Sequence, residues 1–391
     1  MNKTMLIFLM STFIFAMSVA NAFAIVDPLS VPNNKFGIHI LFPSELEQAS
    51  KLVNSNGGDW GYVTIPIQAG DRNLRKWQKF MDDARTNHII PIVRLAESNY
   101  YFDTKVWQKP RYEDILDFAN FLNSLEWPTK NKYVVIYNEV NRSDEWQGNT
   151  NPQEYAQILG FAVDAFKSLD EDFFIIPAGL DNGSINVSQM SINQYDFMHG
   201  MDEELPGIFG RIDGMASHSY PNPAFSQPPW VLTNKSVSSF RYERDVAERL
   251  GRKNLPVFIT ETGWSRDNLS DEKISSYMRY AFETVWSDNN IAAVTPFILR
   301  ASEPYAQFSL IQEDGSYSKT YLTIESMPKM KGEPLLEVEE KNMNTSSRRQ
   351  DLRVKTFKNE NQYDESIVAS IDKAKIATDF LKWFFRSLNV L

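Results

Sequence analysis

The chain has 391 residues, of which 42% are hydrophobic and 23% are charged, and it contains no cysteine. This composition is ordinary for a globular protein, and the missing cysteine excludes disulfides, cysteine metal sites and thiol nucleophiles. The formal net charge of −10 disfavours a nucleic-acid-binding protein, because such a protein needs a basic face. Four histidines leave little for a histidine-rich metal site, so we expect neither a metal nor another cofactor.

Residues 1–24 resemble a secretory signal peptide. Lys3 precedes the apolar run Met5–Val19, and Ala22-Phe23-Ala24 matches the small-x-small pattern of a cleavage site. The run is short for a membrane span, which needs about 20 residues, although an uncleaved anchor remains the alternative. We therefore expect an exported protein, either periplasmic or extracellular.

Eight short apolar runs predict buried β-strands. They are rich in β-branched residues, as expected of parallel strands covered on both faces. The predicted strands are Phe36–Ile40, Tyr62–Ile67, Ile89–Leu95, Tyr133–Tyr137, Phe173–Pro177, Ile212–Ser217, Pro256–Thr260 and Ala293–Ile298.

Amphipathic segments alternate with these strands and predict helices. They are Ser44–Val53, Leu74–Thr86, Tyr112–Leu125, Gln153–Leu169, Gln194–His199, Val237–Leu250, Glu272–Trp286 and Ser318–Met327. Regular alternation of strands and helices over residues 25–327 predicts a (β/α)8 TIM barrel. An open doubly wound sheet is the competing fold, but no G-x-G-x-x-G turn follows the first strand.

Two glutamates stand at the ends of predicted strands. Glu139 follows the fourth strand, and Glu261 follows the seventh. A TIM barrel gathers the carboxyl ends of its strands at one mouth, so both carboxylates should face the same pocket. A single strand-end glutamate is more often part of a buried ion pair or a partner of a helix N-cap, but a facing pair is what glycoside hydrolysis requires.

These motifs resemble clan A of the retaining glycoside hydrolases. The resemblance rests on Asn138-Glu139 after strand four and on Thr260-Glu261-Thr262-Gly263-Trp264 after strand seven. Ser217-His218-Ser219-Tyr220 at strand six is similar to the His-x-Tyr motif of the clan. The likeness covers about Lys35–Met327 and implies a retaining β-glycosidase that cleaves a polysaccharide or oligosaccharide by double displacement; the leader-like N-terminus adds the expectation of export.

The resemblance also implies roles for individual residues. Glu261 would be the nucleophile, and Glu139 would be the acid/base, with a pKa raised by a less polar site or by the charge of its neighbour. Asn138 would bind the 2-hydroxyl of the sugar, while His218 and Tyr220 would orient the substrate and the nucleophile.

Two positions depart from the pattern of the clan. Many members have an arginine at the end of strand two, whereas here Arg94 ends strand three and could either replace it or pair with a core acid. Many members have a tryptophan after strand eight, and here Phe297 could replace it. Further candidates for sugar binding are His39, Trp146 and Trp264, which lie at or near strand ends.

The composition changes after the predicted barrel. Residues 328–365 predict a charged linker, and residues 366–391 predict an amphipathic helix. The helix is a candidate either for docking on protein, in the barrel or a partner, or for peripheral contact with a membrane surface.

Two other functions remain open at this stage. One is a non-catalytic barrel that binds a glycan or scaffolds an envelope complex, and the other is a transglycosylase with the same covalent intermediate. The motifs do not name the sugar or its linkage, and they do not separate endo from exo cleavage.

Overall fold

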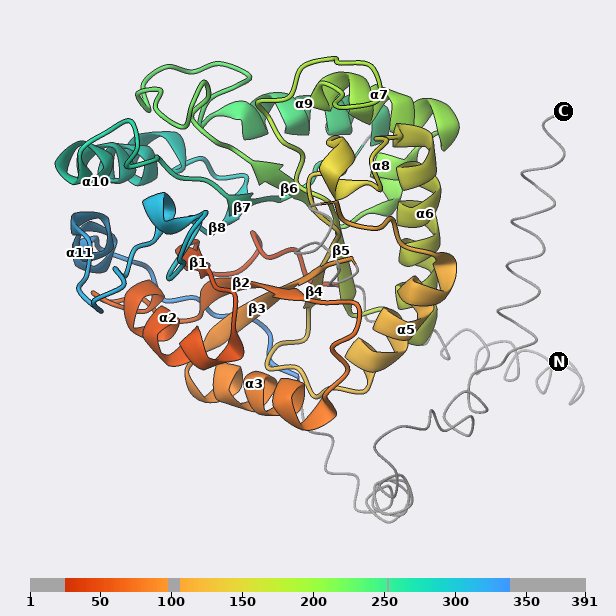
Figure 1. Cartoon of the computed structure of the whole chain (residues 1–391). Coiled ribbons are helices and arrows are strands. Elements are labelled where there is room, and N and C mark those ends of the chain that lie inside the picture. Colours follow the sequence, from red (N-terminus) through yellow and green to blue (C-terminus); the bar gives the residue numbers. More distant parts are fainter. Residues whose placement is uncertain (1–24, 98–105, 252, 338–391) are drawn as a thin grey trace, which may run out of the picture. The chain divides into compact units, whose positions relative to one another are not determined.

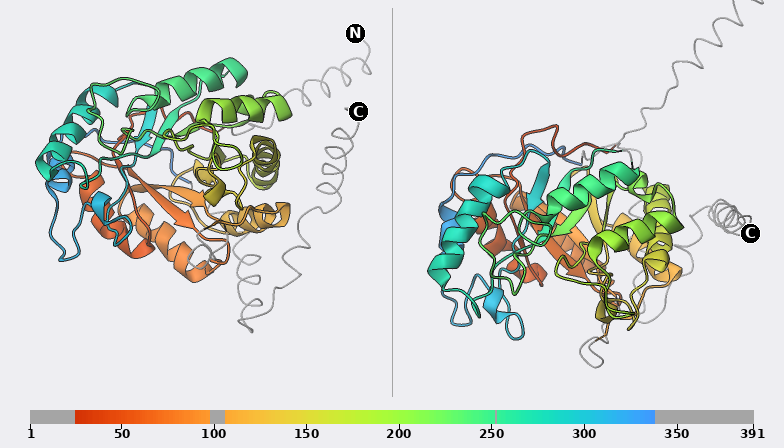
Figure 2. Two further views of the ribbon diagram at one scale, coloured as in Figure 1. Left: turned by 45° about the horizontal axis from the view of Figure 1, so that its top comes forward. Right: turned by 90° about the horizontal axis from the view of Figure 1, so that it is seen from above.

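The computed structural model describes residues 25–97, 106–251 and 253–337. The predicted signal peptide and the predicted C-terminal helix lie outside the described residues. Parallel strands occupy the centre of the molecule and helices surround them (Figure 1). The two turned views in Figure 2 show the same helices on the outer side of the strands. The predicted (β/α)8 barrel is confirmed.

The strands form two parallel sheets whose orders follow the sequence, β1-β2-β3-β4-β5 and β6-β7-β8. A backbone bridge between Phe36 and Val294 joins the first strand to the last, and a bridge between Asp181 and His218 joins the two sheets. These contacts bring the edges of the sheets together. The strands are β1 Gly37–His39, β2 Gly61–Ile67, β3 Ile89–Leu95, β4 Lys132–Ile136, β5 Phe173–Pro177, β6 Met215–His218, β7 Val257–Glu261 and β8 Ile291–Val294.

The longer helices follow the predicted segments closely. They are α2 Leu46–Val53, α3 Leu74–Thr86, α5 Tyr112–Asn123, α6 Pro152–Leu169, α7 Gln194–Glu204, α9 Ser239–Gly251, α10 Asp271–Tyr280 and α11 Lys319–Ser326. Shorter turns are η1 Pro43–Glu45, η2 Ser143–Glu145, α8 Ile208–Arg211, the π-helical η3 Ala281–Val285 and η4 Ala306–Phe308.

Strand β8 ends earlier than predicted. The prediction extended it to Ile298, but Pro296 has no N–H group and cannot donate to a regular ladder. Residues beyond the strand still bond to both neighbours, since His39 N donates to Pro296 O and Phe297 N donates to Thr262 O. The chain after β8 therefore stays wedged between the ends of β1 and β7.

Two apolar layers hold the barrel together. Its inner layer is an aromatic-rich cluster that includes Tyr62, Tyr133, Phe174 and Phe258. The larger outer layer lies between the strands and the helices, where α3 contributes Trp77, Phe80, Met81 and Ala84. Both layers are buried, so the centre of the barrel is a packed core rather than a channel.

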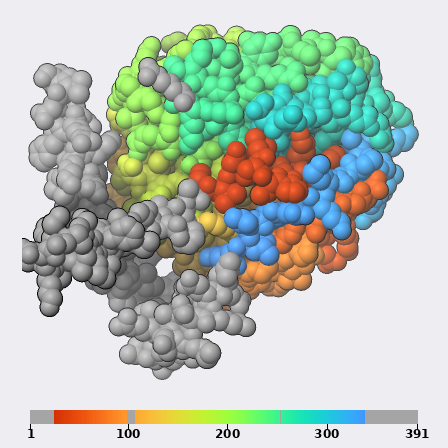
Figure 3. Space-filling view, turned by 180° about the vertical axis from the view of Figure 1, so that it is seen from behind, coloured from red at the N-terminus to blue at the C-terminus, as the bar shows by residue number. Residues whose placement is uncertain are grey.

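Residues 328–337 differ from their prediction as the start of a linker. Lys130 N donates to Leu335 O, and Glu333 N donates to Pro32 O, so this segment follows the barrel surface. Figure 3 shows segments from the two ends of the described chain, red and blue, side by side. The barrel unit therefore extends ten residues past its predicted end at Met327, to Glu337.

Among the described residues, no helix has the length and apolar character that crossing a lipid bilayer requires.

Candidate active site

Five polar side chains converge at the carboxyl ends of the strands. His39 ends β1, His218 ends β6 and Glu261 ends β7, while Arg94 is the penultimate residue of β3 and Glu139 follows β4. Ligand atoms of Glu139, His218 and Glu261 all lie within 4.8 Å of one another. The barrel thus assembles, from distant parts of the chain, the cluster that the sequence predicted.

Glu261 is held from three sides. The Tyr220 hydroxyl donates to Glu261 Oε2 at 3.0 Å, and Arg94 Nη1 donates to Oε1 at 3.4 Å. His39 Nε2 lies 3.7 Å from Oε1. Arg94 therefore reaches the predicted nucleophile from strand three. This fits the first of the two predictions for Arg94, that it takes the place of the arginine that many clan members have at the end of strand two.

His39 contacts Glu261 as a neutral imidazole. It is fully buried, and burial together with the charge of Arg94 lowers the pKa of His39 well below its usual value. Neither of its ring nitrogens has a hydrogen-bond partner in the part of the chain that the structure describes. A neutral ring can both donate and accept, so His39 remains suited to bind a sugar hydroxyl.

Two side chains, His218 and Arg142, hold Glu139. His218 Nδ1 donates to Glu139 Oε1 at 2.9 Å, and Arg142 Nη1 donates to Oε2 at 2.8 Å. The backbone of Glu139 is in the left-handed region, with φ 37°, and so is that of Tyr137, with φ 70°. Non-glycine residues adopt this conformation at a cost of about 1 kcal/mol or more. The strained backbone at Glu139 accompanies the orientation in which its carboxylate meets His218 and Arg142.

The prediction that Glu139 has a raised pKa is wrong for this geometry. Burial alone would raise it, but the hydrogen bond from His218 and the charge of Arg142 outweigh burial and lower the pKa of Glu139 to about 2. Burial likewise opposes the charged form of His218, yet Glu261 and Glu139 raise the pKa of His218 above its usual value. The hydrogen bond between His218 and Glu139 therefore favours the carboxylate form of Glu139.

Two of the predicted sugar contacts remain available at the mouth. Asn138 Oδ1 is a buried acceptor with no partner among the described residues, as a group that waits for a ligand hydroxyl would be. The Phe297 ring is partly exposed and packs edge-to-face on His39, with ring centroids 5.2 Å apart. Asn138 directly precedes Glu139, and Phe297 packs on His39, whose Nε2 lies 3.7 Å from Glu261 Oε1.

Trp146 and Trp264 do not fit the stacking role that the sequence suggested. Trp146 is 1% exposed and its indole N–H donates to Glu154, whereas Trp264 is 2% exposed and donates to the backbone of Gln227. Their rings pack against protein aromatics, Tyr155 in one case and Tyr277 with Trp286 in the other. Both predictions are corrected: these rings are core residues, because their neighbours cover the faces that a sugar would need.

The same cluster has donor types that metal ions use. Two carboxylates and an imidazole could hold a divalent cation. Here, however, Tyr220, His218, Arg94 and Arg142 already direct donors at the carboxylate oxygens. A cation would have to compete with two guanidinium groups, so the donor set fits acid–base chemistry better than metal binding.

Sequence reasoning missed Arg142. Its side chain bridges Glu139 and Asp144, and it comes from the loop directly after β4. The only available signal was its position three residues after Glu139. Glu145, in the next turn, was missed as well; burial and the charge of Glu139 raise its pKa to about 8.

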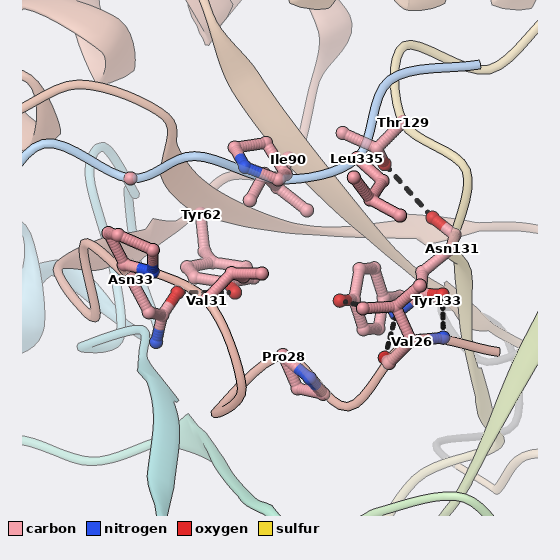
Figure 4. Close-up of a pocket in the computed structure, with 13 residues that line it drawn as sticks. Val26, Pro28, Val31, Asn33, Tyr62, Ile90, Thr129, Asn131, Tyr133 and Leu335 are labelled. Atoms are coloured by element: carbon pink, nitrogen blue, oxygen red, sulfur yellow. Dashed lines mark hydrogen bonds between the residues drawn. The ribbon is translucent and has the colours of Figure 1, made fainter. Parts of the chain in front are cut away.

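The hollow in Figure 4 lies at the opposite end of the barrel. Its lining includes Tyr62, Ile90 and Tyr133, each the second residue of its strand, and segments from both ends of the described chain close over it. None of the predicted site residues lines it. The chemistry-bearing side chains therefore gather at the other mouth alone.

A scan against protein-family models and a search of curated proteins found no match to this sequence. Solved structures do resemble it. A family 39 glycoside hydrolase from Bacteroides cellulosilyticus WH2 aligns over 77% of this chain with a TM-score of 0.52 and 14% identity. This chain spans 65% of the length of that protein.

Two further structures give the same result. A GH128 (subgroup II) endo-β-1,3-glucanase from Sorangium cellulosum covers 75% of this chain, and 98% of its own length aligns, with a TM-score of 0.51 and 13% identity. GH5_18 from Bifidobacterium longum subsp. infantis covers 76% of this chain, and 79% of its own length aligns, with a TM-score of 0.52 and 12% identity. The structural neighbours are clan A glycoside hydrolases, which confirms the predicted resemblance at the level of fold. Fold alone does not assign function, which must be argued from the site.

Proposed function

We propose that the protein is a retaining β-glycoside hydrolase in which Glu261 is the nucleophile and Glu139 is the acid/base. The observation that carries the proposal is the spacing of the two carboxylates. An oxygen of Glu139 lies within 4.8 Å of one of Glu261. Retaining enzymes place their carboxyl groups about 5–5.5 Å apart, whereas inverting enzymes need about 6.5–9.5 Å to admit a water molecule.

In the first step, the Glu261 carboxylate attacks the anomeric carbon and the bond from that carbon to the leaving oxygen breaks. Glu139 gives a proton to this oxygen, and a glycosyl ester of Glu261 remains. In the second step, the Glu139 carboxylate takes a proton from water, the resulting hydroxide attacks the same carbon, and Glu261 is released. Tyr220 and Arg94 would hold Glu261 in line for both steps.

The substrate side of the proposal is a carbohydrate polymer or oligomer. Asn138 and His39 supply unpartnered buried polar atoms for sugar hydroxyls, and Phe297 supplies a partly exposed ring. The endo-β-1,3-glucanase named above makes β-1,3-glucan a reasonable first member of a substrate panel. The leader-like residues 1–24 extend the proposal to an exported enzyme that meets its substrate outside the cytoplasm.

Trapping of the covalent intermediate tests this function. A polysaccharide panel first identifies the sugar, and the matching 2,4-dinitrophenyl 2-deoxy-2-fluoroglycoside is then incubated with the protein. We expect a mass increase of one fluoroglycosyl group on the peptide that contains Glu261. Release of a product with inverted anomeric configuration would contradict the proposal.

Substitution of the nucleophile supplies the second test. Glu261→Ala should lower kcat/KM by about 10⁴-fold or more, and azide should restore part of the turnover as a glycosyl azide. Glu283→Ala is the matched control, because Glu283 is an exposed helical glutamate paired with Arg279 and should keep wild-type activity. Wild-type activity in Glu261→Ala would overturn the assignment.

A further inference from the structure

The acid/base candidate presents a conflict. A proton donor must begin the reaction protonated, but both oxygens of Glu139 already accept hydrogen bonds, one from His218 and one from the guanidinium of Arg142. His218, which serves Oε1, is 1% exposed, whereas the Arg142 side chain, which serves Oε2, is 37% exposed. Oε2 is therefore the oxygen on the solvent side, where a leaving group would arrive, and Arg142 occupies it.

Arg142 has a second anchor that does not depend on Glu139. Its Nε donates to Asp144 Oδ1 at 3.1 Å and its Nη2 donates to Oδ2 at 2.6 Å, a fork-to-fork pair. Only Nη1 reaches Glu139. A small rotation of the guanidinium could thus break the contact with Glu139 and keep Arg142 charged and paired with Asp144.

We propose that Arg142 is a positioning residue that holds Glu139 as a carboxylate and withdraws Nη1 onto the Asp144 side when a sugar occupies the leaving-group position. The proposal rests on the function proposed above. Withdrawal frees Oε2 to carry the proton that the leaving oxygen receives. Glu139 takes up this proton from solvent when Arg142 withdraws. In the second step it regains a proton from the attacking water and returns it to solvent when Arg142 bonds to Oε2 again, so the protons balance over a full turnover.

Other charged groups also face Glu139, and they set the background against which Arg142 acts. His218 and Glu261 come from β6 and β7, and Arg94 comes from β3. The groups on the neighbouring loops are Asp144, Glu145 and Asp181. His218 and Arg142 each bond directly to Glu139, so removal of one of these donors should change the protonation of Glu139 markedly.

The pH profile with a poor leaving group tests the proposal. In Arg142→Gln, the protonated form of Glu139 persists to higher pH, so the alkaline limb of kcat/KM for the oligosaccharide should rise by about one pH unit or more. In Asp144→Asn, the second anchor is lost and Arg142 stays on Glu139, so the same limb should move to lower pH. Opposite shifts in two neighbouring variants are not expected from structural damage.

A good leaving group and a distant arginine serve as controls. A 2,4-dinitrophenyl glycoside needs no proton for departure, so its glycosylation step should change by less than about twofold in Arg142→Gln. Arg249→Gln is the matched control variant, because Arg249 pairs with Asp245 on the exposed face of α9. It should leave both profiles unchanged.

The possible outcomes are separable. An alkaline limb that stays in place in Arg142→Gln, or moves in the same direction in both variants, would overturn the role of Arg142. If Arg142→Gln does not fold, Asp144→Asn alone tests the role of Arg142. A shift of the alkaline limb of kcat/KM to lower pH supports the role, and an unmoved limb refutes it. If the wild-type protein traps no fluoroglycoside on Glu261, the proposed function itself fails, whereas trapping combined with an unmoved limb refutes only the positioning role.

Discussion

The two ends of the barrel satisfy their buried polar groups in different ways. At the amino ends of the strands, the Asn131 side chain exchanges hydrogen bonds with the backbone of Val26 and donates to the Tyr133 hydroxyl (Figure 4). The Tyr62 hydroxyl donates to Asn33 nearby. Every polar side chain named here has a partner, which is the arrangement expected of a region that only supports the fold.

The mouth at the carboxyl ends is organised differently. Buried polar atoms of His39, Arg94, Asn138 and Thr260 have no hydrogen-bond partner among the described residues. Each such group costs about 1–3 kcal/mol, and two carboxylates face each other in the same place. The unpartnered polar atoms that lower the stability of the fold in this comparison lie at the carboxyl-end mouth. We therefore expect substitutions at this mouth to change activity and substitutions at the other end to change stability.

The largest expected effect in this comparison is at Glu139. Glu139→Ala removes the proposed proton donor, so kcat/KM for an oligosaccharide should fall by about 10²–10⁴-fold. Glycosylation by a 2,4-dinitrophenyl glycoside should be nearly unaffected, because this leaving group departs without a proton. Burst kinetics with both substrates measure the difference, and an equal loss with the two leaving groups would contradict the acid/base role.

Tyr220 should give an intermediate effect. Tyr220→Phe deletes the donor at 3.0 Å from Glu261 Oε2 but leaves the ring packed against Phe225. We expect a loss of about 10–100-fold in kcat/KM, which corresponds to about 1.4–2.7 kcal/mol of transition-state stabilisation. The thermal midpoint should hardly change. Tyr242→Phe, on the exposed part of α9, is the control, and a comparable loss of activity there would remove the special role of Tyr220.

The sequence predicted much of this organisation because barrel strands obey simple rules. Buried strands read as short β-branched runs, and β3 and β5 were predicted with their observed bounds. Once the strands are placed, their last residues must share one mouth, which is why Glu139 and Glu261 could be identified. A residue's place at the end of a strand can be recognised from the sequence alone, without knowledge of its contacts.

Side-chain direction and long-range pairing could not be predicted in the same way. Trp146 and Trp264 lie near strand ends, but their indoles turn inward because backbone or carboxylate acceptors and aromatic neighbours lie there. The low pKa of Glu139 depends on His218, which comes from strand β6, and on Arg142, which comes from the loop after β4. Both features are set by tertiary contacts that no local pattern encodes.

The smallest effect on activity is expected at the opposite end. Asn131→Ala would leave the backbone of Val26 without both of its side-chain partners in a site that is largely buried, so the free energy of unfolding should fall by about 2 kcal/mol. Catalysis should remain within about twofold of wild type, because no proposed catalytic group lines this hollow. Denaturant unfolding and kcat/KM measure the two quantities, and Asn289→Ala, at an exposed turn, provides the control. A large loss of activity with unchanged stability would mean that the two ends of the barrel do not divide stability and function as their hydrogen bonding implies.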